Sequence, residues 1–569
     1  MQTLLRPPPL RHRLPRRPLA ASLAALAGLA LSAGAPGPAC ATPPAPAAVA
    51  AVRTGTGSLL DGDRLDALTI PRAQRLMDGG RLSSHTLTAS YLDRIRRLDR
   101  RLGAVLRVNP RALREATASD LVRRRAGARG PLEGIPVLLK DNVDTADLPT
   151  TAGSRALLGS RPATDATLVS RLRAGGAVVL GKANLSEWAN FRGSGSTSGW
   201  SAVGGPTANP HILDRNPCGS SSGSATGVAA SLAQVAIGTE TDGSIVCPAG
   251  TTGVVGHKPT LGLVSRAGVV PISAQQDTAG PIARHVVDAA LTLQVLQGLD
   301  PRDPATAGVP AGVPDRYRPD PAALRGARLG VWRLAGIDPA ADAVVDRSLQ
   351  ALRDAGATLV EVDLPQQELF ADETTALRAE FHRDVDAYLA ATPGRHPADL
   401  AGLVSFNEAD PVELRHFGQD TFLAALNGPA AHDPVAVAAR ERATGAARAM
   451  IDGALAAHDL DAIVAPTNGL AWVTDLEHGD SFVGPSSSTP PAVAGYPNVT
   501  VPAGLAGRLP VGLSFLGARW SDADLLSLAA AFESATRARA VPRLLPTLPD
   551  PAAALDPRVA RSGAPAAAR

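Results

Sequence analysis

The stretch PCGSSSGSATGVAASLAQVAIGTETDGSIVCP, which spans residues 217–248, decides how the rest of the chain is interpreted. It holds two loops rich in Gly, Ser and Thr, at 219–224 and 239–244, with small and apolar residues between them. Glycine and serine suit loops in which the backbone turns sharply and comes close to a ligand, because few side-chain atoms are in the way. A helix and a strand between the loops can bring Ser220 and Ser244 close together.

The residues within and after this stretch predict further elements. Small residues favour a helix over 225–232, the apolar residues after them favour a strand over 233–238, and Ile-Val-Cys at 245–247 is typical of a strand. The sequence Asp-Thr-Ala-Gly-Pro at 277–281 predicts a turn. Apolar periodicity predicts strands at 134–140, 177–180, 329–332, 358–362, 462–467 and 498–502, and helices at 87–98, 110–125, 185–190, 283–298, 342–355, 370–390, 435–458 and 525–537.

Strands that alternate with helices predict a layered α/β domain. The chain of 569 residues is long enough to bury a large core. Hydrophobic residues make up 45% of it and aromatic residues only 3%, so Ala, Val and Leu must fill that core. A net charge of +3 gives no support for nucleic-acid binding, which needs a strongly basic surface.

The N-terminus has the features of a secretory signal peptide. Basic residues precede an apolar run at 19–33, and small residues then lead to Ala39-Cys40-Ala41. A membrane anchor needs about 20 apolar residues, and this run is shorter. We therefore expect residues 1–41 to be removed on export to the periplasm or the medium, which leaves no stable membrane span in the mature chain. A lipoprotein anchored through Cys40 is the less favoured alternative.

Cleavage near Ala41 leaves two cysteines, Cys218 and Cys247, which flank the two serine loops. A disulfide between them is conceivable in an oxidising compartment, but two separate buried thiols are the favoured interpretation. The segments 42–67 and 541–569 are rich in Pro and Ala and are predicted to be flexible.

Three familiar kinds of site fit the sequence poorly. G-S-S-S-G at 219–223 matches the elbow of Ser-His-Asp hydrolases with Ser221 as nucleophile, but a turn precedes it and no histidine has a recognisable catalytic setting. Residues 176–183 match a phosphate loop only superficially, because the middle residues form an apolar strand and Ala183 lacks the hydroxyl that magnesium needs. No cluster of His or acidic residues has the spacing of metal ligands, so no metal and no cofactor is expected.

A serine with lysine as its base fits better. Lys140 ends an apolar strand, where by default its side chain would reach out to solvent. Burial would instead lower the pKa of the lysine by disfavouring the ammonium form. A neutral amine could then take the proton of a serine hydroxyl.

Several motifs in order make the chain resemble the amidase signature family of serine amidohydrolases. They are GPLEGIPVLLKDN (130–142), GKANLSEWANF (181–191), GGPTANP (204–210), PCGSSSGSATGVAA (217–230), GTETDGSIVCPA (238–249), GVVGHKPTLGLVSR (253–266) and QDTAGPIAR (276–284). The resemblance implies a three-layer α/β/α sandwich with a mixed central β-sheet. It also implies one amidase domain at 68–540, with the signature core at about 130–300.

The resemblance further implies a Ser-Ser-Lys triad of Lys140, Ser220 and Ser244. Ser244 would be the nucleophile that forms an acyl-enzyme, and Ser220, held by a cis peptide bond, would relay protons to and from Lys140. Ser194 falls where the family places a contact to substrate. The oxyanion hole would be formed by the backbone amides of Thr241, Asp242, Gly243 and Ser244.

Two residues depart from the family pattern T-G-G-S-I-R. Val246 stands in place of the arginine, and Asp242 adds a carboxylate beside the oxyanion site. The reading T-E-T-D-G-S together with C-G-S-S-S-G-S is most similar to the peptide amidase branch, whose members remove ammonia from C-terminal peptide amides.

We therefore expect an exported amidase, monomeric or homodimeric, that acts on peptide amides or other small amides. An aryl or fatty acid amidase is one alternative. The amidotransferase component that amidates glutamyl-tRNA is another, although the signal peptide argues against that cytosolic enzyme. A Ser-His-Asp esterase that uses Ser221, or a non-catalytic binding protein on the same fold, completes the alternatives.

Overall fold

The computed structural model describes residues 58–336 and 338–548 of the chain. The predicted signal peptide, Cys40 and the chain beyond residue 548 lie outside the described residues.

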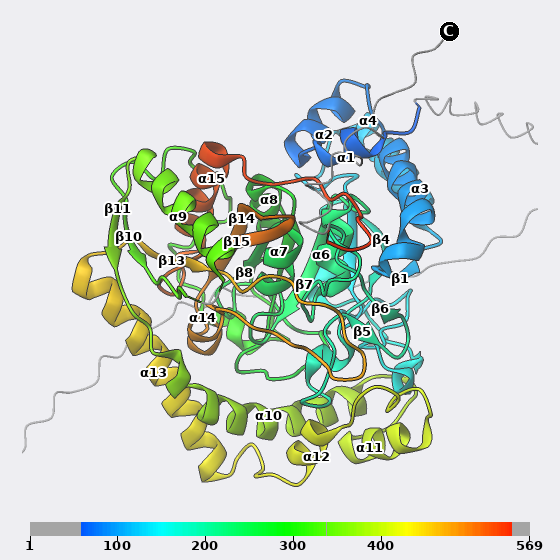
Figure 1. The fold of residues 1–569 in the computed structure, drawn as a ribbon. Coiled ribbons are helices and arrows are strands. Elements are labelled where there is room, and N and C mark those ends of the chain that lie inside the picture. The colour runs from blue at the N-terminus through cyan, green and yellow to red at the C-terminus, as the bar shows by residue number, and fades with distance from the viewer. Residues whose placement is uncertain (1–57, 337, 549–569) are drawn as a thin grey trace, which may run out of the picture. The chain divides into compact units, whose positions relative to one another are not determined.

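One mixed β-sheet of 11 strands organises the described chain (Figure 1). β2 runs parallel to both of its neighbours, β4 and β7, whereas β7, β9, β8 and β14 are antiparallel in succession. From edge to edge the order is β1 (Val105–Val108), β4 (Val178–Ala183), β2 (Pro136–Lys140), β7 (Val235–Glu240), β9 (Thr278–Ala283), β8 (Val255–Lys258), β14 (Asn498–Ala506), β15 (Leu509–Leu516), β13 (Ala462–Pro466), β10 (Arg328–Val331) and β11 (Thr358–Glu361).

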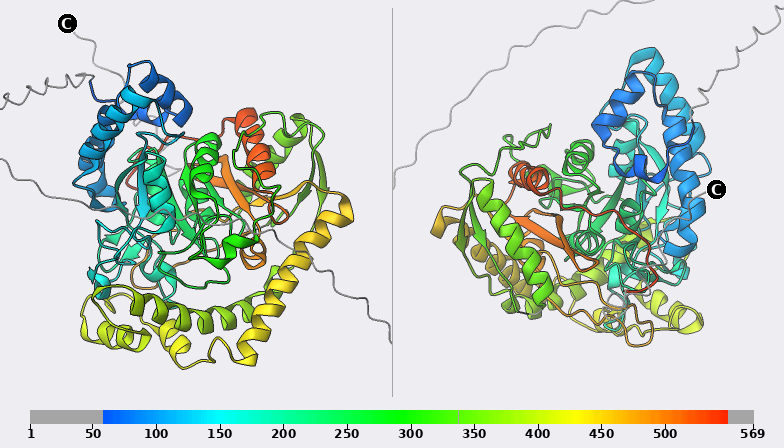
Figure 2. Two further views of the ribbon diagram at one scale, coloured as in Figure 1. Left: turned by 180° about the vertical axis from the view of Figure 1, so that it is seen from behind. Right: turned by 45° about the horizontal axis from the view of Figure 1, so that its top comes forward.

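Helices cover both faces of this sheet, as two neighbouring residues of β8 demonstrate. A Cβ at Gly256 would meet Ala249 of α7 (Val246–Thr252), whereas His257 contacts Asp522 at the start of α15 (Asp522–Thr536). Because consecutive strand residues point to opposite faces, α7 and α15 lie on opposite sides. α6 (Ser222–Ala229) packs against α7, and α8 (Val286–Leu296) and α9 (Pro339–Asp354) pack against α15. The predicted three-layer sandwich is confirmed, and Figure 2 gives two further views of it.

The remaining helices surround this core, and α13 packs against both α10 and α14 (Figure 1). In the part of the chain that the structure describes, no helix has the length and apolar character to cross a membrane. The helices are α1 (Gly62–Asp66), α2 (Ile70–Asp78), α3 (Ser84–Leu102), α4 (Ala112–Ala126), α5 (Thr167–Ala174), α10 (Phe370–Ala391), α11 (Leu400–Ala409), α12 (Asp420–Leu426), α13 (Pro434–His458) and α14 (Thr489–Ala494). Two small sheets pair β3 (Gly159–Ser160) with β12 (Gly394–Arg395) and β5 (Trp200–Ser201) with β6 (Gly205–Pro206).

Three predicted elements are wrong. Of the predicted turn at 277–281, residues 278–281 belong to β9 in the middle of the sheet. Residues 245–247 lead into helix α7 rather than forming a strand. The helix expected at 185–190 is only a 3-10 turn, Glu187–Asn190. By contrast, the rejected phosphate loop does contain a buried strand, β4, as predicted.

The packed chain extends beyond both ends of the predicted domain. α1 begins at Gly62, inside the segment predicted to be flexible, and its Leu65 is fully buried. At the other end, the carbonyl of Leu545 accepts a hydrogen bond from Leu213 N at 2.8 Å. The helix Gly62–Asp66 and residue Leu545, both in segments predicted to be flexible, thus contact the core, which Pro- and Ala-rich composition does not indicate.

Candidate active site

Lys140 is the last residue of β2, and its side chain is fully buried. Its Nζ donates to the Ser220 hydroxyl at 2.7 Å, and to the hydroxyl and the carbonyl of Thr239 at 2.8 and 3.1 Å. Asn142 Nδ2 donates to the same Thr239 hydroxyl at 2.9 Å. Thr239 belongs to β7, which is parallel to β2, so these two strands bring their polar ends to one edge of the sheet.

The surroundings of Lys140 change its pKa. Burial disfavours the ammonium form and lowers the pKa of Lys140 to about 7, although the negative charges of Asp277 and Glu240 act in the opposite direction. The amine is therefore partly neutral near pH 7, and a neutral amine can accept a proton.

Ser220 lies in the first serine loop, directly before α6. The Gly219–Ser220 peptide bond is cis, as the resemblance implied. The Ser220 carbonyl accepts a hydrogen bond from Ser186 N at 3.1 Å, and Ser221 N donates to the Ser244 carbonyl at 3.1 Å. The main chain thus ties the first serine loop to the second.

Ser244 lies in the turn between β7 and α7, and only 8% of it is exposed. Among the hydrogen bonds of the described residues, none joins the hydroxyls of Ser220 and Ser244. The structure therefore links Lys140 to Ser220 through their side chains, and links Ser244 to the Ser220 loop through the main chain.

The loop at 241–244 presents a row of backbone N–H groups. Within residues 58–336 and 338–548, these four amides donate no hydrogen bond to a protein acceptor. Gly243 has a φ of +75°, a conformation that glycine adopts without strain. Neighbouring N–H groups without acceptors are suited to stabilise a negative charge that develops on a substrate oxygen.

Side chains from distant segments fix this loop. Thr241 Oγ1 donates to the carboxylate of Asp277 at 2.6 Å. The hydroxyls of Ser488 and Thr489 donate to the two carboxylate oxygens of Asp242. Asp242, which departs from the family pattern, is therefore held by the start of α14.

Two buried charges stabilise the end of the sheet where the family's arginine is absent. Glu240 Oε2 accepts hydrogen bonds from Ile245 N at 2.7 Å and from Val246 N at 3.0 Å. Burial raises the pKa of Glu240, and the positive charge of Lys258 counteracts this rise. A carboxylate at the first turn of α7 also satisfies amides that a helix leaves without partners.

The Ser221 hydroxyl holds the backbone of β7. Its hydroxyl donates to the Thr239 carbonyl at 3.1 Å and accepts from Thr239 N at 3.2 Å. Both bonds go to the backbone of β7 rather than to a histidine. Within the described residues, no group of three or more His, Cys, Asp or Glu side chains could hold a metal ion.

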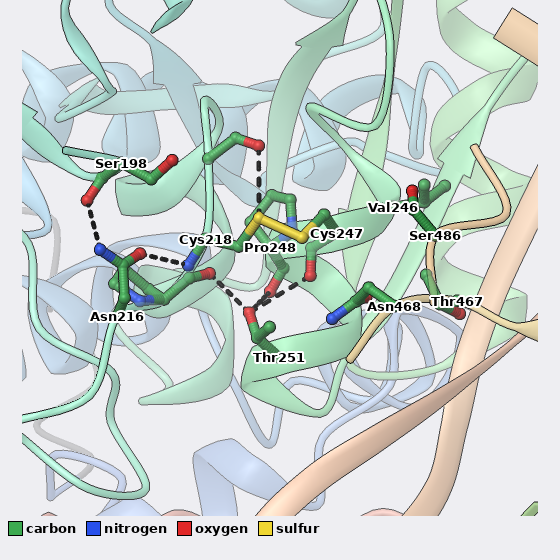
Figure 3. Close-up of a disulfide and its surroundings, with 12 residues drawn as sticks. Ser198, Asn216, Cys218, Val246, Cys247, Pro248, Thr251, Thr467, Asn468 and Ser486 are labelled. Atoms are coloured by element: carbon green, nitrogen blue, oxygen red, sulfur yellow. Dashed lines mark hydrogen bonds between the residues drawn. A yellow bond between two sulfur atoms is a disulfide. The ribbon is translucent and has the colours of Figure 1, made fainter. Parts of the chain in front are cut away.

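Cys218 and Cys247 form a disulfide (Figure 3). The favoured interpretation of two separate thiols is therefore wrong. The bond joins the start of the Ser220 loop to the first turn of α7, and beside it Thr251 Oγ1 donates to the Pro217 carbonyl at 2.6 Å. Sequence spacing could not reveal the pairing, because the two loops become neighbours only in the folded chain.

Ser194 is exposed and lies apart from these contacts. Its N–H donates to the two carboxylate oxygens of Asp420, at the start of α12, at 3.0 and 3.3 Å. The structure thus brings together Lys140 and the two serine loops, whereas Ser194 is bonded to Asp420 of α12.

Sequence reasoning missed the roles of Thr239 and of the pair Ser488 and Thr489. A signal for Thr239 was present, because it follows an apolar strand just as Lys140 does. No local signal marks Ser488, which lies 246 positions from Asp242.

Known proteins match this chain over most of its length. The profile described as Amidase matches residues 86–526. The chain belongs to the amidase family. A solved structure of native peptide amidase from Stenotrophomonas maltophilia is 50% identical, with a TM-score of 0.79, and the match covers 84% of this chain and 99% of that one.

Two further relatives extend the comparison. A protein described as "Probable amidase" from Arabidopsis thaliana is 40% identical over 482 residues, which are 82% of this amidase and 89% of the relative. The solved structure of an amidase family protein from Bacillus anthracis is 34% identical, with a TM-score of 0.76, and the match covers 85% of this chain and 94% of that one. The resemblance inferred from the sequence motifs, with its likeness to peptide amidases, is confirmed.

Loss of the disulfide is expected to impair this amidase. In a Cys218→Ala/Cys247→Ala variant only hydrogen bonds would hold the Ser220 loop to α7, so kcat should fall more than KM rises. The free energy of unfolding should fall by about 3 kcal/mol, as for other loops of this size. Steady-state kinetics and denaturant unfolding measure the two effects. Wild-type enzyme reduced with dithiothreitol should behave like the variant, and an unchanged kcat in both would contradict this expectation.

Proposed function

We propose that this amidase is an exported serine hydrolase that removes ammonia from C-terminal peptide amides through an acyl-enzyme on Ser244. The observation that carries the proposal is the fully buried Lys140, whose Nζ lies 2.7 Å from the Ser220 hydroxyl and whose pKa is about 7. A lysine acts as a base for a serine only when its amine is neutral, and this site favours the neutral amine.

In the first step, the Ser244 hydroxyl attacks the carbonyl carbon of the amide. The proton of Ser244 passes to Ser220, and the proton of Ser220 passes to the lone pair of Lys140. The two N–H groups of the neutral amine can remain on the hydroxyl and carbonyl of Thr239 meanwhile. The carbonyl electron pair moves onto oxygen, where the amides of 241–244 stabilise the negative charge.

In the second step, the C–N bond breaks as the oxyanion collapses to an ester on Ser244. Lys140 returns its proton through Ser220 to the leaving nitrogen, so that ammonia departs. A water molecule then attacks the ester, again with Lys140 as the base. The carboxylic acid leaves and the Ser244 hydroxyl is restored.

Two observations support the finer parts of the proposal. The solved structure at 50% identity is described as a peptide amidase, which favours peptide amides as substrates. The Cys218–Cys247 disulfide favours an oxidising compartment, in agreement with the signal peptide expected from the sequence.

We expect Ser244→Ala to abolish turnover and also labelling by a serine-directed phosphonylating probe, because the attacking oxygen is lost. Ser221→Ala is the matched control in the neighbouring loop, and it should keep the labelling and a measurable turnover, although it removes two hydrogen bonds to the backbone of Thr239. Intact-protein mass spectrometry after incubation with the probe measures the labelling. Labelling that survives in Ser244→Ala but is lost in Ser221→Ala would favour the Ser-His-Asp alternative.

The rate should depend on pH through Lys140. Below its pKa the amine is protonated and cannot accept a proton, so kcat/KM should rise about tenfold per pH unit up to about pH 7 and then level off. Lys140→Met keeps the side-chain bulk without the base, and Lys140→Arg brings a guanidinium that stays protonated. Both should lower kcat by about 10²–10⁴-fold.

Thermal unfolding controls for misfolding of the Lys140 variants. A folded Lys140→Met enzyme with wild-type turnover on any amide that the wild type cleaves would exclude the Ser-Ser-Lys mechanism.

A substrate panel tests the proposed specificity. It compares a peptide amide, the same peptide with a free carboxylate, and the anilide of its last residue. We expect the wild type to release ammonia from the amide and to leave the internal peptide bonds intact, as followed by ammonia assay and mass spectrometry. Release of aniline without release of ammonia would identify an aryl amidase instead.

A further inference from the structure

The chain between β13 and α14 contains a loop, residues 472–488, that we call the strap. In Figure 1 it is the orange loop that reaches from the region of α14 toward β5. Its first half contacts the loop that precedes Ser220, and its last residue contacts the loop of the oxyanion site.

Asp480 and Trp472 attach the strap to the chain just before the first serine loop, residues 219–224. The Asp480 carboxylate accepts hydrogen bonds from Ser198 N at 3.0 Å, Asn216 Nδ2 at 3.3 Å and Trp472 Nε1 at 3.1 Å. Asn216 N also donates to the Trp472 carbonyl at 2.7 Å. Asn216 Oδ1 in turn accepts from Cys218 N at 2.8 Å, so these bonds lead directly into the catalytic serine loop.

Ser488 attaches the other end of the strap to the loop at 241–244, which we call the oxyanion loop. Its hydroxyl donates to the Asp242 carboxylate. The same hydroxyl oxygen lies 3.0 Å from where a Cβ of Gly243 would be. Residues 481–487 therefore cross from the serine loop to the oxyanion loop, the two loops that flank the reacting amide in the proposed mechanism.

The crossing residues include two exposed apolar side chains, Phe482 and Val483, with 38% and 71% of their surface exposed. Phe482 packs edge-on against Trp472, with ring centroids 5.4 Å apart. Two residues of chain span at most about 7 Å, so Phe482 stays close to the anchored Asp480. Covering exposed apolar surface with a ligand lowers the free energy of the complex.

We propose that Phe482 and Val483 form an apolar subsite for the side chain of the residue that carries the amide. The inference rests on the proposed function and names its substrate class as peptide amides that end in a large apolar residue. The occupant must lie on the acyl side of the scissile bond, because the leaving side of a primary amide carries only hydrogen atoms. A leucine or phenylalanine side chain would cover both residues, whereas glycine would leave them in water.

The test compares two amides that differ only in this side chain, N-acetyl-phenylalaninamide and N-acetyl-glycinamide. Ammonia release gives kcat/KM for each, and the wild type should favour the phenylalanine amide by at least about 10-fold. Phe482→Ala should reduce this ratio by about 10-fold, mainly through a higher KM for the phenylalanine amide. Phe482→Leu, which keeps an apolar side chain, should retain most of the preference.

Val483→Ala provides a second variant that removes apolar surface with little risk to folding, because most of this side chain is exposed. It should lower the ratio in the same direction. Val435→Ala is the matched control, since Val435 is 61% exposed on α13, outside the strap, and its ratio should equal that of the wild type.

The outcomes distinguish a failure of the apolar subsite from a failure of the proposed function. A wild type that cleaves both amides equally well, or a Phe482→Ala variant that loses the same factor on both, would overturn the subsite and leave the proposed function in place. A wild type that releases ammonia from neither amide but cleaves anilides would overturn the proposed function itself.

Discussion

The buried amine of Lys140 is the group on which the rest of the site depends. A charged amine removed from water is costly unless protein acceptors replace the lost hydration. Thr239 supplies two of these acceptors and Ser220 supplies the third. Their positions require the parallel pairing of β2 with β7 and a serine loop folded over the ends of both strands. The same packing of β2, β7 and the serine loop thus buries the amine of Lys140 and supplies its acceptors.

The pKa of Lys140 is set by opposing effects that come from different strands. Burial lowers it, whereas Asp277, just before β9, and Glu240, at the end of β7, raise it. Both carboxylates have a second task. Asp277 accepts the hydroxyl of Thr241, and Glu240 accepts the first amides of α7. The groups that hold the loop at 241–244 therefore also keep the pKa of Lys140 from falling further.

The sequence predicted the parts of this arrangement that depend on local pattern. The apolar runs of β2, β7 and β13 are strands, and the motifs identified Lys140 as a candidate base. β9 escaped prediction because Gly280 and Pro281 are typical of a turn, and only the neighbouring strands make a buried strand of them. α7 was not predicted because the β-branched residues Ile245 and Val246 are typical of a strand. In the structure their amides bind the carboxylate of Glu240, and a helix follows. These failures share one cause, since contacts with other segments override local preference.

The site has a general part and a selective part. In the proposed mechanism, the base, the two serines and the oxyanion loop come from residues 140–244 and act on the amide whatever side chain it carries. Selectivity has to come from groups around the substrate's side chain. The strap is the segment proposed to supply them, and it is anchored at Asp480 to Asn216 and at Ser488 to Asp242. No periodicity or motif marks residues 472–488 as part of a site. The role proposed for them rests on the two anchors, Asp480 and Ser488, which stand in the chain on either side of Phe482 and Val483.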